Sequence, residues 1–190
     1  DAYEETLRAE GKVIAGFAER RAAIVSALKG AAAGATVIMP DALLDEVAGL
    51  VEWPVVYAGT FDPAFLAVPQ ECLILTMQQN QKYFALADAH GSLLHRFLLV
   101  SNVTTVDPDA IVHGNERVLR ARLADAKFFF DQDRKTKLEA RVERLGTVVY
   151  HNRLGSQLDR VARITRLALR IAAMTGAGQD EVERAARLAK

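Results

Sequence analysis

The sequence predicts an α+β protein in which a mixed, sheet-containing region is followed by an all-helical region. Up to about residue 102, short helical segments alternate with β-like runs, whereas beyond residue 107 almost every segment follows the 3.6-residue helical period. The composition, 51% hydrophobic and 25% charged residues, is ordinary for a folded globular chain. We therefore place a boundary near residue 105, which gives two domains, 1–105 and 106–190.

The first domain should alternate helices and strands as far as a hairpin. Pro40 and Pro69 each precede a helical segment, and Gly91 can supply the positive φ of a hairpin turn. The predicted elements, in order, are a strand at 12–15, a helix at 17–33, a strand at 36–39, a helix at 41–50, a strand at 53–60, a helix at 70–79, and a hairpin of strands 82–88 and 92–101. The second hairpin strand is so apolar that it should be central and covered on both faces.

The second domain should consist of three or more helices. Asp107 and Pro108 suit the N-cap and the first turn of a helix that reaches residue 131 or beyond. Its predicted buried stripe is Val112, Leu119, Leu123, Ala126 and Phe130. A second helix, at 137–145, carries few apolar residues and can also be a continuation of the first through a bend. A third helix spans 156–174, and a final helix begins near 179. The third helix should bury Leu158, Val161, Ile164, Leu167, Ala168, Ile171 and Ala172.

The formal net charge of zero hides an asymmetry between the two halves of the chain. Residues 1–110 carry 7 Lys and Arg against 14 Asp and Glu, a net charge of −7, whereas residues 111–190 carry 17 against 10, a net charge of +7. A basic half is typical of a protein that neutralises phosphates at one end. A set of solvated helix faces explains the same charges, and the residues alone do not separate these two interpretations.

Several classes of site are not supported by the sequence. The single cysteine, Cys72, excludes an internal disulfide and is predicted to lie in the core. The four histidines are scattered without metal-ligand spacing, and there is no Gly-rich phosphate loop, so we expect neither a metal nor ATP, and hence no cofactor, in this chain. Without a signal peptide or a membrane-spanning run, we expect a cytoplasmic protein with no membrane partner. The start at Asp1 and the helical pattern up to Lys190 predict an excised fragment of a longer polypeptide.

Two polar clusters are candidates for contacts with RNA. Lys82 and Tyr83 are predicted to open a strand on opposite faces, where they can contact a nucleotide backbone or base, or else be a lysine at a strand entrance beside a core aromatic pair. The second alternative is favoured. Asn115, Glu116 and Arg117 form either a cluster that faces a substrate or a hydrogen-bonded joint between sheet and helices.

The joint is favoured for this second cluster because intrahelical pairs can occupy its charges. Glu116 is spaced to pair with Arg120, and Arg122 with Asp125. The aromatic run 128–130 is predicted to be core or a domain interface, not a platform on which bases stack.

The third helix carries a row of four arginines, here called the Arg stripe: Arg160, Arg163, Arg166 and Arg170. At about 100° per residue they fall within an arc of roughly 120°. Asp159 is the only acid nearby. The Arg stripe is therefore the best electrostatic candidate for a nucleic-acid contact, with a solvated helix face as the open alternative.

Several spaced blocks carry a resemblance to a known family. They are Gln81-Lys82-Tyr83-Phe84, Val100-Ser101-Asn102, Gly114-Asn115-Glu116-Arg117, Arg122-Leu123-Ala124-Asp125-Ala126, Phe128-Phe129 and Leu154-Gly155. In this order they resemble the beta subunit of the bacterial two-subunit glycyl-tRNA synthetase. The resemblance is densest from 53 to about 169 and looser over the first 50 residues.

The resemblance implies a fold and a division of labour. It implies a B3/B4-like α+β domain followed by an HD-like helical domain, here truncated at its C-terminus, in an α2β2 enzyme that joins glycine to tRNA(Gly) with ATP. The alpha subunit would hold the active site, and this chain would bind tRNA, pack against the remaining domains of the beta subunit and have no ligase activity alone. The hypothetical tRNA contacts are Lys82, Tyr83, Asn115, Arg117, Arg122, Arg160, Arg163, Arg166 and Arg170.

The chain departs from that pattern in two respects, and two other functions stay open. It lacks the metal ligands of a working HD domain, and Ser156 stands where the family is expected to have Thr. One alternative is an editing-type hydrolase site, which needs convergent polar groups near Lys82, Tyr83 and Asn102. The other is a structural connector, in which Arg122 and Asp125 are buried in the intact protein.

Overall fold

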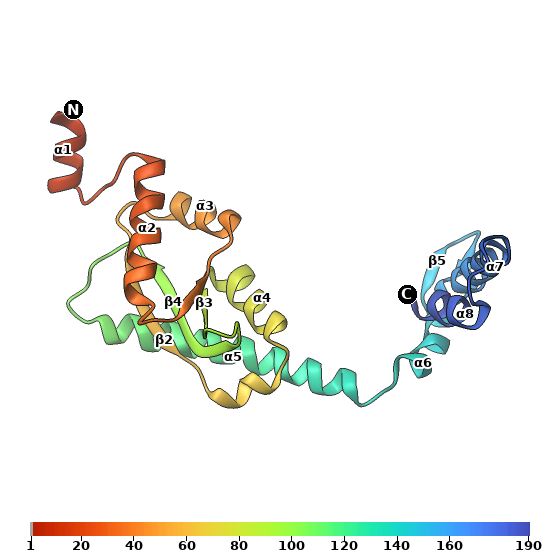
Figure 1. The fold of residues 1–190 in the computed structure, drawn as a ribbon. Helices are drawn as coiled ribbons and strands as arrows, with labels where there is room; N and C mark the ends of the chain where they lie inside the picture. Colours follow the sequence, from red (N-terminus) through yellow and green to blue (C-terminus); the bar gives the residue numbers. More distant parts are fainter. Residues whose placement is uncertain (1) are drawn as a thin grey trace. The chain divides into compact units, whose positions relative to one another are not determined.

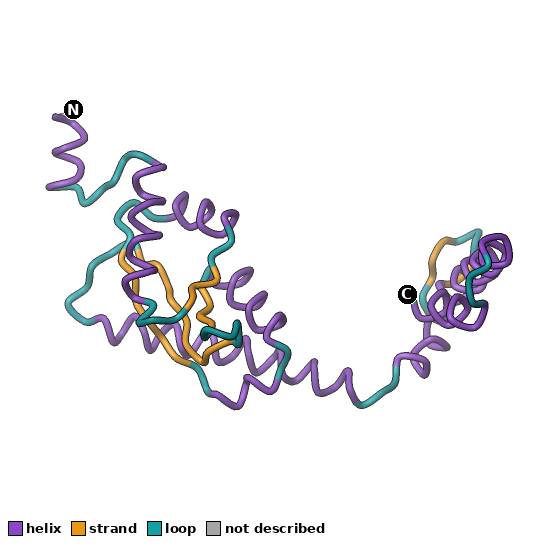
Figure 2. Tube along the Cα trace, in the orientation of Figure 1, coloured by secondary structure: helices purple, strands orange, loops and turns teal. Residues whose placement is uncertain are grey.

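A computed structural model describes residues 2–190, which are mixed α and β as predicted (Figures 1 and 2). The chain divides into two compact units: unit 1 ends at Phe130, and unit 2 is Asp131–Lys190. Unit 1 contains α1 (Ala2–Ala9), α2 (Phe17–Ala31), β1 (Thr36–Ile38), α3 (Asp41–Leu50), β2 (Val55–Thr60), a 3-10 turn (Pro63–Ala67), α4 (Gln70–Gln81), β3 (Phe84–Ala87), β4 (Leu93–Ser101) and most of α5 (Pro108–Arg134).

The core of unit 1 is a four-stranded antiparallel sheet in the order β1-β3-β4-β2. Neighbouring residues of a strand face opposite sides. Accordingly, Leu98 of β4 packs with α2 and α3, whereas Phe97 and Leu99 pack with α4 and α5. The prediction that this strand is central and covered on both faces is confirmed. The hairpin turn before it is held by Asp88, whose Oδ1 accepts from the backbone N of His90 and of Ser92.

Helix α5 belongs to the sheet domain over most of its length. It begins at Pro108, and Asp107 Oδ1 accepts from the backbone N of Ala110 at 3.2 Å, which confirms the predicted cap. Leu119 and Leu123 are fully buried against the sheet. Unit 1 therefore extends past the predicted boundary near residue 105, since these leucines are part of its core. The B3/B4-like and HD-like descriptions of domains 1–105 and 106–190 stay predictions.

Unit 2 contains α6 (Leu138–Arg141), a 3-10 segment (Val142–Thr147), a two-stranded hairpin of β5 (Val149–His151) and β6 (Gly155–Ser156), α7 (Gln157–Thr175) and α8 (Gln179–Leu188). Helix α7 opens with a capping box: Ser156 Oγ accepts from the backbone N of Asp159 at 3.1 Å, and Asp159 Oδ2 accepts from the backbone N of Ser156 at 2.7 Å. These bonds to Ser156 lower the pKa of the Asp159 carboxyl. At the other end, Gly176 with φ 75° terminates the helix.

Some predicted elements are wrong. Residues 12–15 are not a strand; the segment is a loop, and Ile14 N donates to Glu52 O at 2.9 Å. Cys72 is exposed, because the buried face of α4 is formed by Leu73 and Met77 instead. The hairpin of unit 2 was not expected. Within residues 2–190, no helix combines the length and the hydropathy needed to cross a membrane.

Candidate functional site

Lys82 terminates a helix instead of opening a strand. It is the C-cap of α4 in the left-handed conformation, with φ 58° and ψ 31°, and its backbone N donates to Gln78 O at 3.2 Å. Glycine and asparagine are the usual residues in this conformation, so a lysine gave no sequence signal for the helix end. Its Nζ lies 2.8 Å from Glu46 Oε1 of α3. The ammonium is thus paired within unit 1.

Tyr83 is part of the core, as the favoured alternative predicted. The side chain is only 4% exposed and stacks on Phe97 with ring centroids 4.7 Å apart. Its hydroxyl donates to Asn115 Oδ1 at 2.5 Å. Burial raises the pKa of Tyr83 to about 12, so at neutral pH the phenol is a protonated hydrogen-bond donor.

The next residues form the hydrogen-bonded joint between sheet and helix. Asn115 Nδ2 donates to Ile111 O at 2.7 Å while Asn115 Oδ1 holds Tyr83. Glu116 Oε1 accepts from the backbone N and from Oγ1 of Thr60, at 2.8 and 2.9 Å. These contacts fasten α5 to β2 and to the start of β3.

The predicted intrahelical ion pairs of α5 do not form in the part of the chain that is described. The Glu116 carboxylate accepts hydrogen bonds from Thr60 and does not pair with Arg120. Arg122 and Asp125 are both exposed, and among residues 2–190 no ion pair joins them. Arg117 is exposed as well. Arg117 and Arg122 therefore remain accessible to a partner.

A pocket of about 200 Å³ brings three of the predicted contact residues together: Lys82, Tyr83 and Asn115. The rest of its lining is Val47, Leu50, Val51, Gln81, Leu99 and Val100. No carboxylate or histidine is among these residues, and the polar groups of the three predicted residues already hold protein partners. The pocket can bind by apolar contact and hydrogen bonding, but these lining residues supply no free nucleophile or general base.

Asn102 lies outside this pocket, so the pocket does not bring together Lys82, Tyr83 and Asn102, as the editing-type alternative requires. Its Oδ1 accepts from the backbone N of Glu52 and of Trp53, at 2.6 and 2.9 Å. Asn102, Glu52 and Trp53 line a separate pocket of about 440 Å³, together with Gly11, Lys12, Val103 and Thr104. Asn102 therefore connects the segment before β2 to the end of β4 through these two hydrogen bonds. The residues 100–102 alone gave no signal for this structural role.

The Arg stripe of α7 separates into two pairs. The Arg160 guanidinium lies 4.4 Å from the centre of the Tyr150 ring, and Arg163 Nη1 donates to Leu154 O at 2.9 Å. These two arginines are half-buried and hold α7 to the β5–β6 hairpin. Arg166 and Arg170 are exposed, and within residues 2–190 neither makes a hydrogen bond or an ion pair through its guanidinium.

Among residues 2–190, no ion pair neutralises the guanidinium of Arg166 or Arg170. Asp159, the acid nearest in sequence to Arg166, is bound to Ser156 in the capping box. Exposed, unpaired guanidinium groups are suited to bidentate contacts with phosphate or carboxylate oxygens. No group of three or more side chains suited to hold a metal occurs within the described residues.

A family model and individual relatives point to the same protein family. The model of the family described as glycyl-tRNA synthetase beta subunit matches residues 1–190. A protein of Neisseria meningitidis serogroup A, named glycine--tRNA ligase beta subunit, is 59% identical over 192 residues, which cover 100% of this chain and 28% of that protein. Proteins with the same name from Ralstonia nicotianae and Aromatoleum aromaticum are each 60% identical over the whole chain, which covers 27% and 28% of them.

The chain thus spans less than a third of the length of the curated relatives that it matches. The family match nevertheless runs through both units. Because the family model covers every residue of the chain, this chain belongs to the glycyl-tRNA synthetase beta subunit family.

Proposed function

We propose that this chain is a tRNA-binding and scaffolding portion of a glycine--tRNA ligase beta subunit. In this proposal it supports the ATP-dependent attachment of glycine to tRNA(Gly) in the cytoplasm, while an alpha subunit carries the catalytic site and binds the ATP. The chain itself would hold no cofactor and would be inactive alone. Its partners would be the alpha subunit, tRNA and the remaining domains of the beta subunit.

The observation that carries the tRNA contact is the pair of exposed, unpaired arginines on one face of α7. Arg166 and Arg170 project from a capped 19-residue helix, so two positive charges are presented from a rigid element. Each phosphate contact releases counterions and makes affinity depend on salt. Arg117 and Arg122 of α5 are further candidates, whereas Lys82, Tyr83, Asn115, Arg160 and Arg163 are engaged within their own units and support the scaffold instead.

The test is tRNA binding to the 190-residue chain across a salt series. We expect the double charge reversal Arg166→Glu and Arg170→Glu to weaken binding at low salt. It should also reduce the slope of log affinity against log salt by about 2, one for each lost phosphate contact. The matched control reverses two other exposed arginines of unit 2 that lie outside α7, Arg144→Glu and Arg153→Glu.

An equal loss in both double variants would mean that net charge alone, and not the α7 face, determines binding. A wild-type chain that binds no tRNA at any salt would refute the tRNA contact. It would leave the structural connector, the candidate that the joint of α5 favours independently. That second function predicts that Arg122 and Asp125 become protected when the rest of the beta subunit is present.

A further inference from the structure

Unit 2 buries very little apolar surface of its own. Of the hydrophobic residues buried among the described residues, 24 lie in unit 1, and four, Val142, Val161, Ala172 and Ala186, lie in unit 2. Both hydrophobic core clusters also belong to unit 1. Two of the four are alanines, which contribute little burial. A 60-residue unit is close to the size below which a single core barely offsets the entropy of folding.

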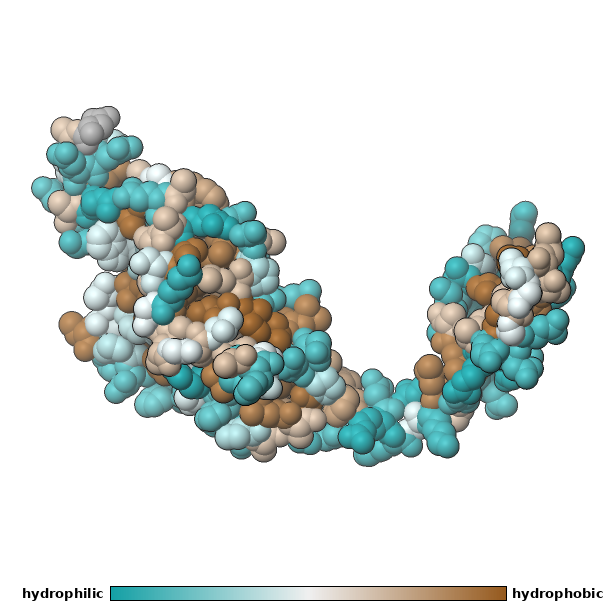
Figure 3. Space-filling model, viewed as in Figure 1, coloured by the Kyte–Doolittle hydropathy of each residue, from teal (hydrophilic) through white to brown (hydrophobic). Residues whose placement is uncertain are grey.

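The apolar side chains that would form a core are present in unit 2 but lie at its surface (Figure 3). The large hydrophobic residues exposed there are Leu138, Val148, Val149, Tyr150, Leu154, Leu167, Ile171 and Met174. The prediction that Leu167 and Ile171 are buried is therefore wrong for this chain: they are 58% and 59% exposed. Burial of a helix face requires a second element, and none within residues 131–190 covers this one.

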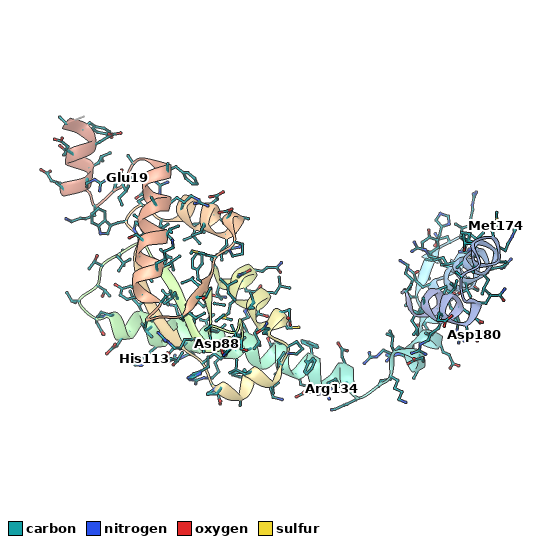
Figure 4. The ribbon with its side chains drawn as sticks, viewed as in Figure 1. Glu19, Asp88, His113, Arg134, Met174 and Asp180 are labelled. Carbon is teal, nitrogen blue, oxygen red and sulfur yellow. The ribbon has the colours of Figure 1, made fainter. Side chains whose placement is uncertain are left out.

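Three of these side chains form a continuous line along α7, here called the α7 ridge: Leu167, Ile171 and Met174. Met174, the most exposed of them at 86%, lies at the C-terminal end of the helix (Figure 4). Their spacing of four and then three residues keeps them within an arc of about 60°. Ridges with this spacing fit into the grooves of another helix.

The chemistry of the surface selects among possible occupants. RNA offers phosphates and bases, which explain Arg166 and Arg170 but would leave the three apolar side chains of the ridge without an apolar partner. A second copy would bring the same arginines towards their own counterparts, and like charges in an interface are unfavourable. A helix with an apolar face fits the ridge without either cost.

We propose that the α7 ridge is covered by an amphipathic helix from another part of the same polypeptide. Unit 2 buries only four hydrophobic residues of its own, so an occupant that is present permanently would supply the apolar burial that this unit lacks. A segment in cis meets that requirement, because its effective concentration is high and independent of any partner. The relatives supply such sequence, since the chain covers 28% of the protein from Neisseria meningitidis.

The experiment measures thiol accessibility on the ridge in two polypeptides. Cys72 is exposed and is first replaced in a Cys72→Ser background. Leu167→Cys and Ile171→Cys are then placed separately in the 190-residue chain and in the full-length subunit that contains it. Ala162→Cys and Ala173→Cys are matched controls, since both positions are exposed on α7 and lie more than about 100° away from the ridge at the helical period.

We expect labelling at the two ridge positions to be about 100-fold slower in the full-length subunit alone, with the controls changed less than about 3-fold. Equal rates in both polypeptides would overturn the proposal. Slowing that needs added alpha subunit, added tRNA or higher protein concentration would also overturn it, and would assign the ridge to a second subunit, to RNA or to a second copy.

Hydrogen exchange of unsubstituted α7, compared in the same two polypeptides, guards against a variant that misfolds. Slower exchange of the α7 amides in the full-length subunit alone would support the proposal. Unchanged exchange would contradict it.

Discussion

Replacing Tyr83 with Phe tests the joint between the sheet and α5 by removing one oxygen atom. The variant keeps the ring and its stacking on Phe97, but it loses the hydroxyl that donates to Asn115 Oδ1 at 2.5 Å. Asn115 keeps its bond to Ile111 O, so the lost contact is confined to one buried donor and one acceptor. The change therefore measures the hydrogen bond with little change in packing.

The magnitude at neutral pH follows from burial. A typical net hydrogen bond contributes about 0.5 to 1.5 kcal/mol, and an acceptor left unpaired in the interior costs about 1 to 3 kcal/mol. Asn115 is only half-buried, so water can partly replace the lost donor. We expect the free energy of unfolding to fall by about 1 to 2 kcal/mol.

The pH dependence gives an independent signature. Because burial raises the pKa of Tyr83 from 10.0 to about 12 in the folded state, folding favours the neutral phenol. The stability that this shift contributes is complete below pH 10 and is lost as the pH rises from about 10 towards about 12. The shift corresponds to about 3 kcal/mol over that window, as an order of magnitude. At neutral pH wild type should have a higher free energy of unfolding than Tyr83→Phe. This difference should shrink and then reverse as the pH rises above about 10.

The assay is urea unfolding between pH 7 and 11.5, followed by the fluorescence of Trp53, the only tryptophan in the sequence. Tyr57→Phe is the matched control, since its hydroxyl makes only a 3.4 Å bond to Val103 O at the surface. An alkaline loss that is the same in wild type and in Tyr83→Phe would refute this reasoning, because another group would then be responsible.

Three further substitutions probe packing, helix propensity and capping. In Gly59→Ala the new Cβ would lie 2.6 Å from Phe97 Cζ, so we expect an overpacked sheet and a loss of about 1 to 3 kcal/mol in urea unfolding. Gly114→Ala, which meets nothing within 4 Å inside α5, should instead stabilise by about 0.5 to 1 kcal/mol, and a loss at both glycines would contradict the packing argument. Ser156→Ala removes the bond from the backbone N of Asp159 to Ser156 Oγ, which is one half of the capping box of α7, and should cost about 1 kcal/mol, seen as lower helicity of unit 2 in circular dichroism. Since the pKa of Asp159 is lowered in the folded state, the same cap should weaken as the pH falls below about 4. Ser156→Ala should reduce that acid sensitivity without abolishing it, because the backbone N of residue 156 still donates to Asp159 Oδ2.

Local signals in the sequence were sufficient where a residue's own chemistry sets the backbone. Pro40 before Asp41 marks the start of α3, because the proline ring fixes φ and cannot continue a preceding helix. Ser156 and Gly176 mark the two ends of α7, because the serine hydroxyl accepts from a free backbone N–H and the glycine adopts the left-handed conformation that ends a helix. The apolar run of β4 predicted an inner strand, since both of its faces must be covered.

The errors arose where an outcome depends on residues distant in the sequence. The sequence predicts a strand at Lys82, but this residue ends α4 in the left-handed conformation. In that position its side chain pairs with Glu46 of α3, which is distant in the sequence. Periodicity correctly grouped Leu167 with Ile171 on one face, yet periodicity does not tell whether a partner covers that face. For the candidate site, the sequence predicts the four arginines of α7 as one group. It does not distinguish the two that are bound within unit 2 from the two that are exposed, because their partners, Tyr150 and Leu154, lie in a hairpin that the sequence did not predict.

The bond between Glu116 and Thr60 also bears on aggregation. Strand β2 lies at an open edge of the sheet, where unpaired amides invite a strand from another molecule. Glu116 occupies the amide of Thr60 and places a negative charge beside this edge. The residue that attaches α5 to the sheet therefore also blocks one end of β2 as a template for intermolecular pairing.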